Sequence, residues 1–254
     1  MDLFWALLLA VVQGLTEWLP ISSSGHLVVI QQLMGLNTTV AFDVLLHLGT
    51  LASVIAYFWR DVLAILRALF TLNTHDPNFR ILLLLILGSI PAALAAFLFL
   101  GFFESLFTNM LVVGGGFITT AIILTLSRFH RGKKDLDWPV ALIMGLLQTL
   151  AIIPGISRSG STISSGLLWG TDREKVFRFA FLLSIPAILG ATAFELIKTP
   201  SVAIDINSVV AATVAAVVGY IAIRVVRRFV MSDRFYLFAI YCVAMGLAVI
   251  IYAL

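Results

Sequence analysis

Six stretches of this 254-residue chain are long and apolar enough to cross a lipid bilayer, and they limit the fold more than any other feature. A helix needs about 20 mostly apolar residues to span a hydrocarbon core of about 30 Å. The stretches are residues 40–59, 81–100, 110–126, 177–197, 209–223 and 235–254. Runs such as residues 81–87 lack the alternation of apolar and polar side chains found in membrane β-barrels. The sequence therefore predicts an all-α integral membrane protein.

The charge content agrees with a membrane protein and gives little support to a nucleic-acid partner. Charged residues make up 11% of the chain, against about 25% in an ordinary soluble domain. The net charge is only +3, so we expect no nucleic acid as a partner and the lipid bilayer as the surrounding medium.

An internal repeat is visible when the sequence is shifted by 135 positions. Residues 6–29 then align with residues 141–164 without a gap. The identical pairs include Gln13 with Gln148, Ile21 with Ile156, Ser22 with Ser157, Ser24 with Ser159, Gly25 with Gly160, Gly35 with Gly170 and Phe42 with Phe177. We therefore predict one membrane domain, residues 1–254, made of repeat 1 (about 1–130) and repeat 2 (about 136–254).

Each repeat begins with two short helices that are interrupted by Pro, Gly and Ser. The first pair is predicted at residues 3–19 and 24–34, and the second at 138–153 and 161–169. The second helix of each pair is too short to cross, so both pairs are predicted to be re-entrant hairpins, with three full spans after each. Three crossings per repeat make the second repeat inverted relative to the first. Interrupted helices at matching points of inverted repeats commonly mark a binding site near the bilayer midplane.

The basic residues are distributed as this topology requires. All but two of the 16 Lys and Arg residues fall on one side: Arg60, Arg67, Arg80, Arg128, Arg131, Lys133, Lys134, Arg173, Lys175, Arg178, Arg224, Arg227, Arg228 and Arg234. Lys198 falls on the other side, and Arg158 lies in the second hairpin. The positive-inside rule makes the crowded side cytoplasmic. We expect a multi-pass protein of the plasma (inner) membrane, with both termini and the active-site mouth on the outer side.

The hairpins carry polar residues for which two interpretations are available. Ser is a favoured N-cap, so residues 22–24 and 157–159 can simply cap the second helix of each hairpin. Capping does not explain Glu17, His26 and Arg158, because ionisable residues at membrane depth are costly and usually functional. A purely structural ion-pair network is the alternative for these three residues.

The two repeats share a framework and differ in their chemistry. The S-x-S-G pattern supplies two helix N-termini, which bind anions and especially phosphate. At equivalent positions the first repeat has Glu17, Ser23 and His26 where the second has Ile152, Arg158 and Ser161. Arginine suits phosphate because its planar group binds two oxygens at once. An acid, an imidazole and a guanidinium around two helix N-termini indicate phosphoryl chemistry.

Both hairpin motifs resemble those of a known family. QGLTEWLPISSSGHL (residues 13–27) and PGISRSGST (residues 154–162) are similar to the two signature motifs of the undecaprenyl-diphosphatase (BacA/UppP) family, and the flanks FDVLLHLGT (42–50) and FRFAFLLSIPAILGA (177–191) resemble it too. The resemblance implies a phosphoric anhydride hydrolase that converts undecaprenyl diphosphate, a prenyl diphosphate lipid, to undecaprenyl phosphate for cell-wall synthesis. Because bacitracin sequesters this substrate, the resemblance also implies bacitracin resistance.

The resemblance assigns roles by motif position. Glu17, Ser23, His26 and Arg158 become catalytic candidates, with either His26 or Ser23 as the nucleophile. The expected phosphate-binding residues are Ser22, Ser24, Gly25, Ser157, Ser159, Gly160, Ser161 and Thr162. The family's dependence on Mg²⁺ or Ca²⁺ makes Glu17 and Gln13 the candidate ligands, since residues four apart share a helix face. Gln13 stands at a position where the family has Glu or Gln, which removes one carboxylate.

Two further interpretations remain open. Asp43 and His47 are also four residues apart and form either a supporting pair behind the site or ordinary contacts between packed helices. The alternative function is a phosphate or lipid-phosphate transporter or flippase, because inverted repeats with broken helices are typical of secondary transporters. A carrier, however, has little reason to place a base beside a nucleophile. The sequence leaves a homodimer open.

Overall fold

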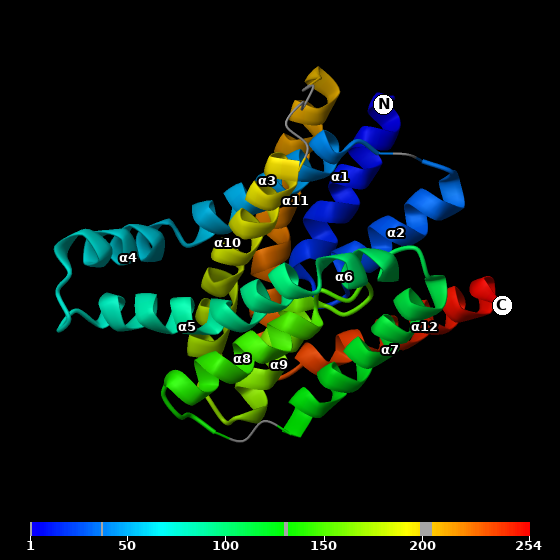
Figure 1. The fold of residues 1–254 in the computed structure, drawn as a ribbon. Coiled ribbons are helices and arrows are strands. Elements are labelled where there is room, and N and C mark those ends of the chain that lie inside the picture. Colours follow the sequence, from blue (N-terminus) through cyan, green and yellow to red (C-terminus); the bar gives the residue numbers. More distant parts are fainter. Residues whose placement is uncertain (1, 37, 130–131, 199–204) are drawn as a thin grey trace.

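A computed structural model describes residues 2–36, 38–129, 132–198 and 205–254, and it is helical (Figure 1). Within these residues, the β-type pairing is limited to an isolated parallel bridge between Lys134 and Thr171. Six helical segments are long and apolar enough to span a membrane: α3 (Val40–Tyr57), α5 (Pro77–Leu98), α7 with η1 (Met110–Phe129), α10 (Arg173–Lys198), α11 (Ile206–Met231) and η2 with α12 (Phe235–Ala253). The prediction of an all-α membrane protein with six such helices is confirmed.

Several helix ends differ from the predicted ones because of local caps. Helix α10 includes the predicted span 177–197 and starts before it, at Arg173, since the Asp172 carboxylate accepts the backbone N–H groups of Glu174 (3.0 Å) and Lys175 (3.2 Å). Helix α5 starts at Pro77 because the Asp76 carboxylate caps it, accepting the backbone N–H of Asn78 at 2.8 Å. Helix α11 runs on to Met231, beyond the predicted end at residue 223. A stretch of basic residues ends the apolar run without ending the helix.

Two pairs of short helices occupy the predicted hairpin positions. The first pair is α1 (Leu3–Trp18) and α2 (Ser23–Met34), and the second is α8 (Trp138–Leu150) and α9 (Arg158–Leu168). Helix α9 starts earlier than the predicted residue 161, because Ser157 caps it. Each connection turns through a positive φ, at Ser22 (67°) and at Gly155 (89°). Glycine adopts such a φ without steric cost, whereas the serine is strained there.

Helices α4 (Trp59–Thr71) and α6 (Leu100–Leu106) belong to neither group. Helix α4 is amphipathic. Its Ile65 and Ala68 are buried, whereas Leu66 and Phe70 are exposed. Helix α4 packs against α5, and the two extend together from one side of the molecule (Figure 1).

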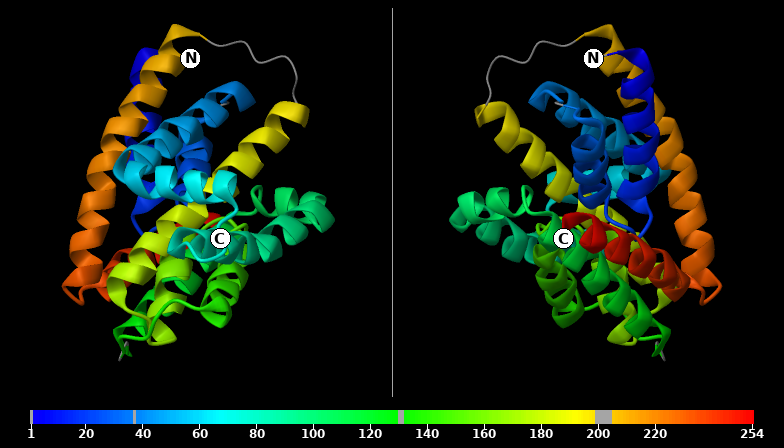
Figure 2. Two further views of the ribbon diagram at one scale, coloured as in Figure 1. Left: turned by 90° about the vertical axis from the view of Figure 1, so that its left-hand side faces the viewer. Right: turned by 90° about the vertical axis from the view of Figure 1, so that its right-hand side faces the viewer.

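The spanning helices and the short helices pack in matched combinations. Helix α1 lies alongside α11 (Figure 2), α8 lies alongside α5, α7 pairs with α12, and α3 contacts both α10 and α11. Small residues permit the closest approaches. A Cβ added at Gly145 of α8 would lie 2.2 Å from the carbonyl oxygen of Gly88 of α5, so any side chain would force these helices apart.

The first turns of α10 collect four ion pairs from neighbouring elements. They are Arg173 with Asp233 (2.7 Å), Glu174 with Arg227 (3.0 Å), Lys175 with Asp135 (2.9 Å) and Arg178 with Asp61 (2.5 Å). The hydrogen bond from Lys175 lowers the pKa of Asp135 below its ordinary value. These contacts gather basic residues that the predicted topology places on one side. Arg131, another of that set, lies outside the described residues.

Candidate active site

The tips of the two helix pairs meet in the interior of the protein. The Ser159 hydroxyl donates a hydrogen bond to the carbonyl oxygen of Leu19 (3.2 Å), which links the second tip to the first. A Cβ built at Gly160 would lie 3.4 Å from the Cβ of Pro20, and one built at Gly25 would lie 3.0 Å from the Cα of Gly155. The first turns of α2 and α9 are therefore close neighbours.

Both of these helices begin with the same cap. The Ser22 hydroxyl accepts the backbone N–H of Gly25 (3.3 Å), and the Ser157 hydroxyl accepts that of Gly160 (3.1 Å). Each cap hydroxyl also lies 3.3 Å from the hydroxyl of the serine two positions later, Ser24 or Ser159. The capping interpretation is confirmed for Ser22 and Ser157. The caps leave the positive ends of two helix dipoles at the junction of the tips, where they favour an anion.

Glu17 is the centre of the polar cluster. Its side chain projects from α1 and is 7% exposed. One carboxylate oxygen, Oε2, accepts hydrogen bonds from the Ser23 hydroxyl (2.6 Å) and from the Gln13 amide (3.1 Å). The other, Oε1, forms an ion pair with the Arg158 guanidinium. The structure thus joins the acid of the first motif to the arginine of the second across 141 positions.

A flat aromatic surface holds Arg158 in place. Its guanidinium lies 5.3 Å from the centre of the Trp18 ring, and its side chain is 16% exposed. Trp18 is fixed in turn, because its indole N–H donates to the Ser53 hydroxyl at 2.9 Å. The ring attracts the cation and restricts its orientation. Arg158 is consequently aimed at Glu17 while part of it remains accessible.

His26 has partners at both ring nitrogens. Nδ1 lies 2.7 Å from the Ser22 carbonyl oxygen, which can only accept, so Nδ1 carries a proton. Nε2 lies 2.6 Å from the Tyr241 hydroxyl, and the two rings are nearly parallel, with 12° between their planes. Phe117 meets the imidazole edge-on, 5.2 Å from its centre. A neutral imidazole with this tautomer accepts the Tyr241 proton at Nε2.

Tyr241 and Thr120 are site residues that sequence reasoning missed. Tyr241 comes from α12, 215 positions after His26. Thr120 of α7 is 1% exposed; its hydroxyl donates to the Gly155 carbonyl oxygen (2.9 Å) and accepts the Ser157 N–H (2.9 Å). Both residues lie inside apolar spans, and no motif marks them. Thr120 fixes the backbone just before the cap of α9.

The comparisons with known proteins identify the family. Residues 6–248 match the family described as "Bacitracin resistance protein BacA". The chain belongs to this family. It is similar to proteins named undecaprenyl-diphosphatase from Methanosphaera stadtmanae (36% identity; 99% of this chain, 98% of the relative), Korarchaeum cryptofilum (39%; 98% and 99%) and Halothermothrix orenii (39%; 100% and 99%).

The remaining expected site residues of this BacA-family chain make hydrogen bonds mainly within their own helices or loops, as follows. The Thr162 hydroxyl donates to the Arg158 carbonyl of its own helix (2.9 Å). Ser161 is buried, and its hydroxyl has no hydrogen-bond partner among the described residues. The Asp43 carboxylate accepts from Thr38 (2.9 Å), and His47 Nδ1 lies 2.8 Å from the backbone oxygen of Asp43. Asp43 and His47 thus meet through the backbone of their own helix.

Two side chains at the tips offer oxygen donors of the type that hard divalent cations prefer. Within the described residues, no group of three or more His, Cys, Asp or Glu side chains is arranged to hold a metal. Glu17 supplies a carboxylate, and the buried Oε1 of Gln13 has no hydrogen-bond partner in this part of the chain. Mg²⁺ is commonly held by one or two carboxylates together with substrate phosphates.

Proposed function

We propose that this protein hydrolyses undecaprenyl diphosphate to undecaprenyl phosphate and inorganic phosphate, and that it thereby recycles the lipid carrier of cell-wall synthesis and confers bacitracin resistance. The observation that carries the proposal is the cluster of Glu17, Ser23 and Arg158 at the junction of two helix N-termini. The BacA family match and relatives named undecaprenyl-diphosphatase support the substrate. The runner-up, a transporter, is not favoured by these names.

In the proposed reaction Ser23 is the nucleophile. Its hydroxyl donates to Glu17 Oε2 at 2.6 Å, so Glu17 can take its proton as the Ser23 oxygen attacks the terminal phosphorus. The bond from that phosphorus to the bridging oxygen breaks, and undecaprenyl phosphate leaves. Water then attacks the phosphorus of the phosphoserine, and the bond from phosphorus to the Ser23 oxygen breaks. Inorganic phosphate leaves, and Glu17 returns its proton to the Ser23 oxygen. Arg158 and the N–H groups of the two helix starts stabilise the charge of both transition states.

His26 is the rival nucleophile, and the contacts of its ring count against it. Both ring nitrogens are engaged, by the Ser22 carbonyl and by the Tyr241 hydroxyl. We assign His26 to proton transfer with the hydrolytic water, because a proton can reach Nε2 through the hydrogen-bonded Tyr241 hydroxyl, whereas a phosphorus atom would have to reach the lone pair itself. Tyr241 also positions the ring in this role.

A bound Mg²⁺ or Ca²⁺ would be held by Glu17 and Gln13 together with the diphosphate, and it would neutralise phosphate charge. The serines of the two caps, with Ser161 and Thr162, are proposed to surround the phosphates. Since the residues of the site all come from one chain, the proposal does not require a homodimer.

We further propose that the two halves are inverted repeats with re-entrant hairpins. In such a repeat, α1 corresponds to α8 and α5 corresponds to α11. The pair α1–α11 therefore corresponds to the pair α8–α5, and the helices of both pairs are packed together. Helix α7 corresponds to α12, and α3 corresponds to α10. The two helices of each of these pairs are also in contact. With the positive-inside rule, this arrangement supports a plasma-membrane protein whose site and termini face outward.

The test is release of phosphate from undecaprenyl diphosphate by the purified protein in detergent, combined with rapid quenching of the reaction. The proposal expects a phosphoenzyme that is stable to acid and labile to base, as phosphoserine is. Ser23→Ala abolishes it, whereas His26→Ala slows its hydrolysis. Ser89→Ala is the control, because the Ser89 hydroxyl of α5 donates to the Leu85 carbonyl of its own helix and Ser89 is not one of the site residues.

Two results would overturn the mechanism or the function. An acid-labile phosphoenzyme that survives Ser23→Ala makes His26 the nucleophile. If the wild type releases no phosphate but moves labelled lipid phosphate across liposomes, the protein is a carrier.

A further inference from the structure

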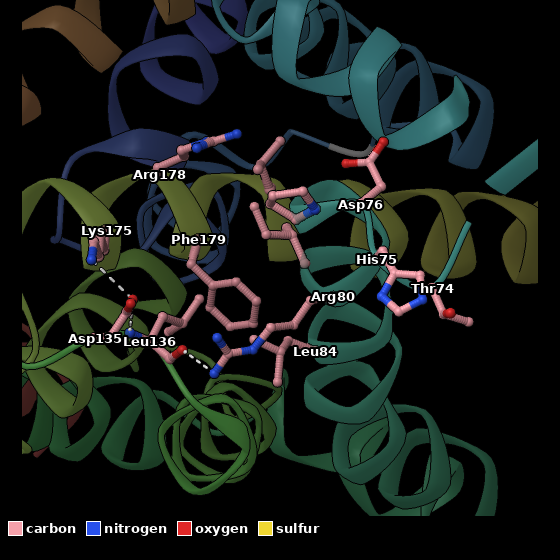
Figure 3. Close-up of a pocket in the computed structure, with 13 residues that line it drawn as sticks. Thr74, His75, Asp76, Arg80, Leu84, Asp135, Leu136, Lys175, Arg178 and Phe179 are labelled. Atoms are coloured by element: carbon pink, nitrogen blue, oxygen red, sulfur yellow. Dashed lines mark hydrogen bonds and ion pairs between the residues drawn. The ribbon is translucent and has the colours of Figure 1, made fainter. Parts of the chain in front are cut away.

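A second candidate binding site lies at the basic end of the molecule, away from the hairpin tips. It is a cavity of about 400 Å³ between the starts of α5 and α10 and the segment that precedes α8 (Figure 3). This volume is in the range of small-molecule sites. None of the catalytic or phosphate-binding candidates lines it.

The lining of the cavity has a charged part and an apolar part. Three cations contribute to it: Arg80 of α5, with Lys175 and Arg178 of α10. The apolar part consists of Ile81, Leu84, Leu136, Phe179 and Leu182. Figure 3 shows the Phe179 ring between the Lys175–Asp135 pair and the Arg80 side chain. Leu84 and Leu182 belong to the membrane-spanning helices α5 and α10 and are buried, so the apolar part of the cavity lies between these two helices.

The cations of the cavity are incompletely neutralised. Lys175 is paired with Asp135 (2.9 Å) and Arg178 with Asp61 (2.5 Å). Arg80 instead donates to the Leu136 carbonyl oxygen (3.2 Å) and takes part in none of the ion pairs of the described residues. A carbonyl satisfies one N–H group and leaves the positive charge in place. Arg178 Nε is in addition buried and without a hydrogen-bond partner in this part of the chain.

Asp76 forms no ion pair with Arg80 among the described residues. Its carboxylate also lines the cavity, where it accepts both the backbone N–H and the side-chain amide of Asn78 (2.8 and 2.9 Å) as the cap of α5. Because Asp135 pairs with Lys175 and Asp61 pairs with Arg178, Arg80 is the cation of the lining that has no carboxylate partner among the described residues.

We propose that this cavity binds an anionic phospholipid, with the phosphate at Arg80 and one acyl chain along the apolar residues. Basic pockets between spanning helices on the cytoplasmic side are suited to anionic lipid headgroups. The apolar lining favours a lipid over a soluble phosphate. The neighbouring α4 supports a lipid surface here, because it packs on α5 and exposes Leu66 and Phe70, as interfacial helices do.

The test is native mass spectrometry of the purified protein titrated with phosphatidylglycerol or with phosphatidylcholine carrying the same acyl chains. The wild type binds phosphatidylglycerol several-fold more tightly. Arg80→Gln weakens that binding about fivefold, which corresponds to about 1 kcal/mol for one cation. Lys175→Gln has a similar effect and carries the test if the Arg80 variant does not fold. Arg67→Gln is the matched control, since Arg67 is exposed on α4 and does not line the cavity.

Three results would overturn the proposal. Equal affinity of the wild type for the two lipids would show that the headgroup is not recognised. If Arg67→Gln weakens phosphatidylglycerol binding as much as Arg80→Gln does, the weakening is a general effect of surface charge. Displacement of phosphatidylglycerol by an equal concentration of glycerol phosphate shows a soluble anion to be the ligand. Arg80→Gln and Lys175→Gln should keep the wild-type rate of phosphate release in detergent, because neither side chain contacts the hairpin tips.

Discussion

The Glu17–Arg158 ion pair makes a quantitative prediction about stability. Arg158→Gln leaves a carboxylate that is 7% exposed without its cation, although Ser23 and Gln13 still donate to it. We expect a loss of about 3 kcal/mol in the free energy of unfolding, at the low end for a broken buried pair. Glu17→Gln should cost less, about 2 kcal/mol, because Arg158 is 16% exposed and keeps its contact with Trp18.

The double variant, with Glu17→Gln and Arg158→Gln together, isolates the interaction itself. It leaves no unpaired charge, so its loss should be smaller than the sum of the single losses by about 2 kcal/mol. An attraction of about 4 kcal/mol between unit charges 4 Å apart, at an effective dielectric constant of 20, sets the upper limit.

The assay is a double-mutant cycle on unfolding by sodium dodecyl sulfate in mixed micelles. The control cycle uses Glu174 and Arg227, an ion pair whose side chains are 52% and 47% exposed. That exposed pair should couple by less than about 1 kcal/mol. A Glu17–Arg158 coupling no larger than the control coupling would refute the contact between the two hairpins.

Two further variants test the residues that come from outside the motifs. Tyr241→Phe keeps the ring stacked on His26 and removes one hydrogen bond, so phosphate release should slow about tenfold with little change in thermal stability. If Tyr241→Phe keeps the wild-type rate while His26→Ala is slow, Tyr241 does not act through His26. Thr120→Val removes the partner of a buried N–H and should cost about 1–3 kcal/mol in unfolding free energy. Thr119→Val is the control, because the Thr119 hydroxyl bonds only within its own helix, and equal losses would contradict the bridging role of Thr120.

Local patterns were sufficient to predict most of the fold. Apolar runs located the six spans, and Pro, Gly and Ser located the two broken helix pairs, because backbone breaks depend on adjacent residues. Helix ends were less predictable. Asp172 caps the start of α10 and Ser157 caps the start of α9 through side-chain hydrogen bonds, which the hydrophobicity of a span does not show.

Of the residues in the site, physical reasoning from the sequence alone singled out the ionisable ones. Glu17, His26 and Arg158 stood out because ionisable groups are rare in apolar surroundings. Tyr241 and Thr120 did not, since a tyrosine or threonine in a span is unremarkable until its partner is known. The cavity at Arg80 could not be predicted from the sequence, because its lining comes from three segments that only the fold brings together.

The most direct measurement asks whether the two hairpin tips touch in the membrane. A Cβ at position 160 would lie 3.4 Å from that of Pro20, close to the separation found in disulfides, about 3.5–4.5 Å. The variant Pro20→Cys with Gly160→Cys, in a Cys242→Ser background, should form an intramolecular disulfide when membranes are oxidised, detected as a peptide joining the two positions. If both thiols remain free and react with maleimide after denaturation, the tips do not meet and the shared site is wrong.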